Sequence, residues 1–180
     1  MEQELQQTVA LLARTPVALN ALLRDLPKAW TLCDEGEHTW SAFDIVCHLI
    51  HAERADWIPR VRFILQLGES QTFEPFDRSG NIREMRDKQL DQLLDGFSRL
   101  RSESLSELQA LDLQKDDLRL RGRHPSLGVV TLSELMATWA VHDLTHLHQI
   151  SRVLAHQYRE AVGPWSGYLG VLQCAGHSSR

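Results

Sequence analysis

Apolar residues recur at intervals of three and four positions along most of the chain, the spacing that places side chains on one face of an α-helix. In the first helical stretch, Pro16 either kinks the helix or restarts it with Thr15 as the N-cap, and in the second Pro59 predicts a bend. Four long amphipathic helices predict an all-α fold, a four-helix bundle. Their predicted ranges are residues 5–26, 41–68, 82–110 and 131–158.

The segments between these helices carry turn and loop signals. Trp30 and Leu32 are expected to pack inward from the first of them. A short helix is predicted at residues 165–173, followed by a frayed polar tail over 175–180. No repeat or linker divides the chain, so residues 1–180 are expected to form one helical domain. The predicted connections are a loop over residues 28–39, a long connection over 69–81, and a small hairpin or ordered loop over 112–130.

Charge and composition narrow the class of protein. The 180 residues carry 19 basic and 24 acidic side chains, a net charge of −5, which argues against a nucleic-acid-binding surface. No apolar run is long enough for a membrane span, and the start MEQELQQ does not resemble a secretory signal, so a cytoplasmic protein is expected. Cys33, Cys47 and Cys174 stand at unrelated spacings, which predicts neither a disulfide framework nor a thiolate zinc site.

The predicted fourth helix has polar residues where a bundle core is expected. Its inward stripe includes three consecutive polar positions, His142, His146 and Gln149. Burying a polar group without a partner costs about 1–3 kcal/mol, so each of these side chains needs a partner. The full stripe is Leu132, Leu135, Trp139, His142, His146, Gln149 and Val153.

A divalent metal ion is one such partner. Histidines four positions apart on a helix can direct their imidazoles at one ion, and a third ligand is expected from the second helix. There His48 lies on the inward stripe and is preferred over His51, with Glu53 as a further alternative. Asp143 follows His142 where helical zinc proteases have glutamate, which argues against that class. Spacing alone also leaves a metal-free hypothesis open. In it, His142 and His146 form hydrogen bonds with each other, with Gln149 or with buried water.

Other polar residues carry weaker signals. Cys47 is expected to be a buried, unreactive thiol, and His124 is expected in a surface turn, with a position above a pocket as the alternative. Asp143 is expected either to orient a metal-binding imidazole from the second coordination shell or to face water. Glu53 and Asp143 are also candidates for a general base.

Two segments together resemble the DinB-like superfamily. The first joins Trp40-Ser41 to Asp44-Ile45-Val46-Cys47-His48-Leu49 and Glu53, and the second runs from His124-Pro125 through Thr138-Trp139 and His142-Asp143 to His146 and Gln149-Ile150. The resemblance implies a four-helix bundle, often dimeric, with a divalent metal held by three histidines. By motif, these are His48, His142 and His146. It also implies a small-molecule substrate, since the family includes thiol S-transferases, a maleylpyruvate isomerase branch and metal-dependent hydrolases.

These observations predict a metal-dependent enzyme, with zinc or nickel as the expected ion. The leading hypothesis is a small-thiol S-transferase that acts on electrophilic small molecules, with a low-molecular-weight thiol as cosubstrate. The alternatives are a metal-dependent hydrolase and a non-catalytic, metal- or ligand-binding helical dimer. A homodimer is expected, and neither nucleic acid nor membrane is expected as a partner.

Overall fold

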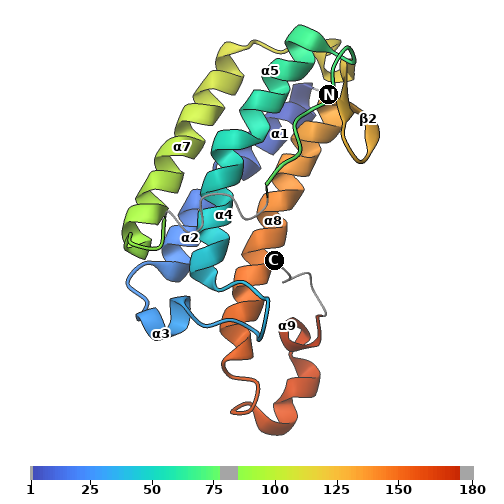
Figure 1. Ribbon diagram of the computed structural model, residues 1–180. Helices are drawn as coiled ribbons and strands as arrows, with labels where there is room; N and C mark the ends of the chain where they lie inside the picture. Colours follow the sequence, from blue (N-terminus) through green and yellow to red (C-terminus); the bar gives the residue numbers. More distant parts are fainter. Residues whose placement is uncertain (1, 78–84, 175–180) are drawn as a thin grey trace.

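The computed structural model describes residues 2–77 and 85–174, which form a bundle of four helical rods (Figure 1). Two of the rods are interrupted, and two are single helices. The rods are α1 (Glu2–Leu12) with α2 (Thr15–Leu23), α4 (Ala42–Ala55) with α5 (Trp57–Leu67), α7 (Leu90–Ala110), and α8 (Leu132–His156). The predicted all-α four-helix bundle is confirmed.

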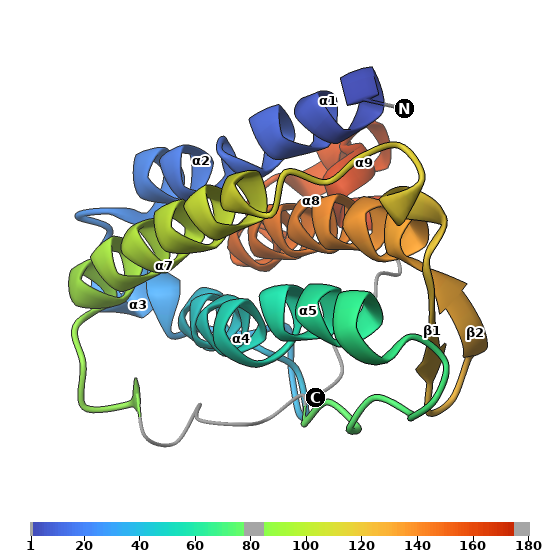
Figure 2. The same ribbon diagram turned by 90° about the horizontal axis from the view of Figure 1, so that it is seen from above.

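The order of the rods in space differs from their order in the chain. The α1–α2 rod and the α4–α5 rod lie on opposite sides of a layer formed by α7 and α8 (Figure 2). Each outer rod therefore packs against both α7 and α8. As a result, side chains of α4 and α8 meet inside the bundle although about ninety residues of chain separate them.

Short elements complete the fold. The predicted hairpin is present: β1 (Arg121–His124) pairs antiparallel with β2 (Gly128–Thr131) just before α8. After α8 the chain folds back beside it through η2 (Gly163–Tyr168) and α9 (Gly170–Gln173) (Figure 1). Two more single turns occur, α3 (Lys28–Thr31) and η1 (Asp117–Arg119). No helix in residues 2–77 and 85–174 is long and apolar enough to cross a membrane.

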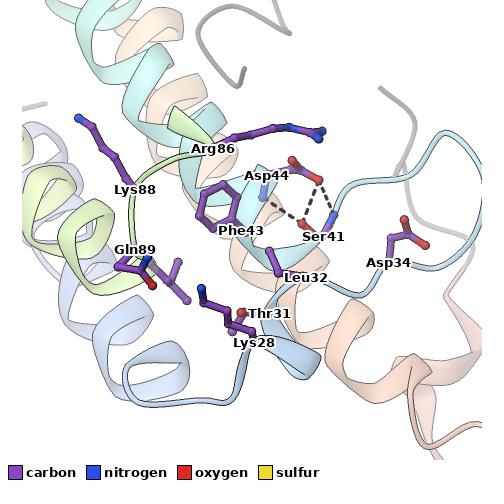
Figure 3. A pocket seen from close by; sticks show the side chains of 11 residues that line it. Lys28, Thr31, Leu32, Asp34, Ser41, Phe43, Asp44, Arg86, Lys88 and Gln89 are labelled. Carbon is purple, nitrogen blue, oxygen red and sulfur yellow. Dashed lines mark hydrogen bonds between the residues drawn. The ribbon is translucent and has the colours of Figure 1, made fainter. Parts of the chain in front are cut away.

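Helix ends follow their local sequence. The Ser41 hydroxyl accepts a hydrogen bond from the Asp44 backbone N–H, and the Asp44 carboxylate accepts one from the Ser41 N–H (Figure 3). Thr131 and Glu134 form the same reciprocal cap at the start of α8. The two helices that carry the candidate histidines thus both begin with a capping box, which fixes where each helix starts.

Several predicted boundaries need correction. The predicted loop over residues 28–39 contains the helical turn α3, and Leu32 is exposed instead of packed inward. The first rod restarts, which is one of the two predicted alternatives, but Thr15 is the first residue of α2 and not its cap. The third helix begins at Leu90, and the part of its prediction over residues 82–84 lies outside the described residues, as does the tail 175–180.

The second rod breaks at Asp56, three residues before the proline expected to bend it. The ring of Pro59 would clash with the carbonyl of Ala55 in a continuous helix. The chain avoids this clash by ending α4 at Ala55 and starting α5 at Trp57, with Asp56 between them at φ −113° and ψ −64°. Pro59 then lies in the first turn of α5, where a backbone N–H has no partner within the helix.

Apolar packing is divided into two clusters by a polar layer. One cluster surrounds Phe97 and Ile150, and the other surrounds Trp57 and Trp139. Each rod contributes polar or charged side chains to the layer between them. These are Thr15 from the first rod, His48 and Glu53 from the second, Arg101 and Ser104 from α7, and His142, Asp143, His146 and Gln149 from α8.

Candidate metal centre

Three imidazole rings converge inside the polar layer. The Nε2 atom of His142 lies 3.1 Å from the Nε2 atoms of both His48 and His146. One ligand atom from each of these three residues lies within 4.8 Å of the other two, and the side chains of His48 and His146 are buried. The structure therefore brings together the three histidines that the sequence selected.

A hydrogen bond sets the tautomer of one ring. The Nδ1–H group of His146 donates to the Oε1 atom of Gln149 over 2.8 Å. Because a carbonyl oxygen only accepts, the proton lies on Nδ1, and Nε2 keeps its lone pair toward the other two rings. The Nδ1 atom of His142, in contrast, is buried without a hydrogen-bond partner among the residues that the structure describes, so its tautomer depends on what its Nε2 atom binds.

Aromatic side chains hold the rings in place. The Trp40 ring centroid lies 4.6 Å from that of His48, and the ring edge of Trp57 meets His142 at 5.0 Å. Trp57 is in turn stacked on Trp139, with centroids 5.7 Å apart and planes 10° from parallel. Packing of this kind limits ring rotation and keeps water away from the imidazoles.

The spacing of the three nitrogens fits a divalent ion. Two nitrogens bound to one zinc ion at about 2.0–2.1 Å lie about 2.9–3.4 Å apart, depending on coordination geometry. The two separations from the Nε2 atom of His142, both 3.1 Å, fall in this range. Burial lowers the pKa of His142 to about 2, and the neighbouring His146 and His48 rings and the Arg101 guanidinium act in the same direction. His142 is therefore neutral near pH 7, which is the form that binds metals.

The three histidines line one cleft of about 580 Å³. Its walls include the aromatic side chains of Trp40, Trp57 and Phe76. The turn of the β1–β2 hairpin lies at another side of the cleft and contributes His124 and Leu127. The cleft is large enough for a small molecule and brings it against the histidine nitrogens.

A second hollow, of about 410 Å³, lies at the starts of α4 and α7 and is less suited to chemistry. Its cations Arg86 and Lys88 extend in different directions, and Asp44 is bonded to Ser41 in the helix cap (Figure 3). Its described lining residues include no histidine. We therefore regard the histidine cleft as the functional site.

Glu53 and Asp143 are not available as catalytic bases. Both carboxylates are buried and paired with Arg101, which donates to Glu53 at 2.8 and 2.9 Å and to Asp143 at 2.5 and 3.1 Å. The Thr15 hydroxyl also donates to Asp143, at 2.6 Å. Burial alone would lower the pKa of Arg101, but the two carboxylates outweigh it and raise the pKa, so the guanidinium stays charged. The prediction that Asp143 orients a ligand or faces water is wrong.

Arg101 was missed in the sequence analysis. It is almost fully buried and lies on a regular inward stripe of α7. The same argument that selected His142 and His146, a polar residue at a core position, applies to it. The stripe is Leu94, Phe97, Arg101, Ser104 and Leu108.

The remaining candidates have separate roles. His51 is only partly buried and stacks on Phe76 at 5.0 Å, outside the cluster. Cys47 is buried, and this burial, with Asp44 nearby, raises the pKa of its thiol to about 12, so it is unreactive as expected. His124 belongs both to a turn and to the cleft wall, because its Nδ1 atom accepts the backbone N–H groups of Ser126 and Leu127.

Comparison with known proteins identifies the family. The family model of the DinB superfamily matches residues 11–150, most of the chain. The chain belongs to the DinB superfamily. Among solved structures, this DinB protein is similar to YfiT from Bacillus subtilis, described as a probable metal-dependent hydrolase with an unusual four-helix bundle topology. The TM-score is 0.73 at 16% sequence identity, over 89% of this chain and 90% of YfiT. No curated protein matches the chain significantly.

Replacing Arg101 is expected to destabilise this DinB bundle strongly. Arg101→Met leaves two buried carboxylates without their counter-charge, which costs about 3–5 kcal/mol of unfolding free energy. Urea denaturation measures this loss. Arg99→Met is the control, because that exposed arginine makes only a 3.7 Å ion pair with Glu103 and should change stability by less than about 0.5 kcal/mol. Equal effects of the two substitutions would contradict the structural role of Arg101.

Metal-free protein is expected to lose stability in acid through His142. In the unfolded chain this ring takes up a proton below about pH 6.5, whereas in the folded chain it does so only near pH 2. The unfolded state therefore binds more protons between these values, and stability decreases as pH falls through that window. The expected contribution at pH 5 is about 2 kcal/mol. Denaturation from pH 7.5 to 5 in the presence of a chelator, compared with His142→Asn, measures it. Parallel pH profiles for the two proteins would be the contrary result.

Proposed function

We propose that this DinB protein is a metal-dependent transferase of small thiols, with its ion held by the Nε2 atoms of His48, His142 and His146. The observation that carries the proposal is the convergence of these three nitrogens in a buried layer that opens into a cleft: His142 Nε2 lies 3.1 Å from each of the other two, and one ligand atom of each residue lies within 4.8 Å of the others. Neutral imidazoles pressed together without a cation would leave at least one lone pair or N–H group poorly satisfied.

The donor set suits a catalytic ion better than a structural one. Structural zinc sites use four protein ligands, whereas catalytic sites keep a position open for water or substrate. The described residues supply three nearby ligands. Imidazole ligands suit zinc and nickel, which are the ions we propose. An ion held there supplies a position at which a small thiol loses its proton near neutral pH.

The residues of the chain bind and shield the reactants. The aromatic walls formed by Trp40, Trp57 and Phe76 exclude water and place an apolar electrophile near the histidines. The sulfur then attacks the electrophilic carbon, a C–S bond forms, and the bond to the leaving group breaks with its electron pair. The thiol proton passes to solvent. For an alkyl halide the products are a thioether and a halide ion.

The distribution of carboxylates favours a transferase over a hydrolase. Hydrolysis needs a group that handles the protons of water and of the leaving group. Among the described residues, Asp56 and Glu134 line the cleft; Glu134 caps α8 by accepting from Thr131, and Asp56, whose pKa is raised by burial, keeps one oxygen, Oδ1, in an ion pair with Arg60. Attack by a thiolate needs no such base.

A metal-dependent hydrolase is the second candidate. It is favoured by the fold shared with YfiT, the probable metal-dependent hydrolase. A non-catalytic metal- or ligand-binding dimer is the third candidate and would use the same histidines. The homodimer, the cytoplasmic location and the lack of a nucleic-acid partner stay predictions.

The protein is expected to bind about one divalent ion per chain. After treatment with a chelator, titration with Zn²⁺ or Ni²⁺ followed by calorimetry should show one high-affinity site, and binding should raise the melting temperature. His142→Ala should abolish this site. His148→Ala is the matched control, because His148 is exposed on the same helix and should leave binding unchanged. Unaltered metal affinity in His142→Ala would rule out the proposed ligand set.

Loaded protein is expected to consume thiol in the presence of an electrophile. Bacillithiol, mycothiol and glutathione are each incubated with alkyl halides and epoxides, and loss of free thiol and formation of thioether are measured. His142→Ala should show only the uncatalysed rate. Turnover of esters or amides without thiol would instead favour the hydrolase, and inactivity on both panels would favour the non-catalytic dimer.

A further inference from the structure

Arg60 lies in the histidine cleft with most of its hydrogen-bonding capacity unused. Its side chain is only 13% exposed, and its Nε atom lies 2.7 Å from Oδ1 of Asp56. The guanidinium carbon lies 5.1 Å above the ring of Phe73. Neither terminal nitrogen forms a hydrogen bond with any residue that the structure describes, and neither is sealed from solvent.

The contrast with Arg101 shows that this is not the usual arrangement of a structural arginine. Arg101 directs Nε and both terminal nitrogens at two carboxylates and the Leu12 carbonyl. Arg60 has a single ionic contact through Nε, which leaves the two-nitrogen edge of its guanidinium open in the cleft. A planar pair of N–H donors of this kind matches the two oxygens of a carboxylate.

Arg60 is also placed at a useful distance from the histidines. It follows Trp57 by three residues on α5, so the two side chains lie about one helical turn apart on one face. The ring of Trp57 meets that of His142. A small molecule can therefore reach from the histidine nitrogens along Trp57 to the guanidinium of Arg60.

We propose that Arg60 binds the carboxylate of a small molecule whose other end lies at the three histidines. This inference rests on the proposed metal-dependent function and adds a class of ligand to it: a monocarboxylate with a short apolar spacer and a metal-binding head. Arg60 is thus a specificity-determining residue. A single negative charge is expected and not two, because Asp56 offsets part of the arginine charge and Glu134 would repel a second carboxylate at the cleft.

The test uses paired probes that differ only in charge. Full-length protein loaded with Co²⁺ is titrated with ω-mercaptocarboxylates of three to six carbons and with ω-mercaptoalcohols of the same lengths. Thiolate binding is followed by the visible and near-ultraviolet spectrum of the cobalt. A second pair of series carries a hydroxamate head in place of the thiol. For at least one spacer length, the carboxylate is expected to bind about 10- to 100-fold more tightly than the matched alcohol.

Substitutions in opposite directions separate recognition from a structural effect. Arg60→Met should abolish the preference for carboxylate and leave alcohol binding within about twofold. Asp56→Asn should increase the preference several-fold, because the arginine loses its internal counter-charge. Arg62→Met is the matched control, since Arg62 lies on the same helix, is exposed and pairs with Glu107, and it should leave the preference unchanged.

Each outcome separates this inference from the proposed function. Carboxylates and alcohols that bind equally, or a preference that survives Arg60→Met, would overturn the role of Arg60 and leave the metal centre standing. A preference shown only by the hydroxamates would support Arg60 and count against a thiol cosubstrate. If Asp56→Asn weakens the preference as much as Arg60→Met does, the pair is structural and the inference is wrong. Absence of binding of Co²⁺, Ni²⁺ and Zn²⁺ alike would overturn both proposals.

Discussion

One guanidinium group joins all four rods of this bundle. Arg101 on α7 binds Glu53 on α4, Asp143 on α8 and the carbonyl of Leu12 at the end of α1, and Thr15 at the start of α2 donates to the same Asp143. Such a buried cluster tolerates little displacement, because a shift of any rod would leave a charge without its partner. The relative positions of α4 and α8, and hence of their histidines, depend on this interaction.

The same cluster has an electrostatic consequence for the histidines. With both carboxylates ionised, one guanidinium and two carboxylates carry a net charge of −1; burial raises the pKa of Glu53, while Arg101 and the Thr15 hydroxyl donate to the carboxylates in the interior. The histidine cluster lies beside it, because Asp143 directly follows His142. Three neutral imidazoles would leave the full +2 charge of an ion to be balanced, and a nearby negative charge reduces the cost of burying that ion. The polar layer is thus one connected electrostatic unit.

Periodicity in the sequence predicted the bundle and the inward position of the three histidines, while the choice of His48 over His51 and Glu53 rested also on the resemblance to the DinB-like superfamily. His142 and His146 interrupt an apolar stripe on α8, and His48 does the same on α4. The helix breaks at Asp56, whereas the bend was predicted at Pro59. A proline indicates that a helix cannot continue past it, but it does not indicate which preceding residue leaves the helical conformation. Arg101 carried the same stripe signal as the histidines, but a long cation on a helix usually extends to water, and its two carboxylate partners are distant in sequence. Which rods are neighbours was equally hidden, since the periodicity of each helix gives a face and not a partner.

Arg101 and Arg60 show why geometry had to decide function. Both side chains are largely buried, and each lies near a carboxylate. Burial and charge pairing alone would therefore assign the two arginines similar structural roles. Arg101 has partners on every rod and no capacity left for a ligand, whereas Arg60 has one contact and an open edge in a cleft. Saturation of the first arginine gives the site its rigidity, and the unused donors of the second give it a means of selection. The cleft holds the histidine nitrogens at one position and the open edge of the Arg60 guanidinium about one helical turn beyond Trp57. It therefore discriminates ligands by both length and charge.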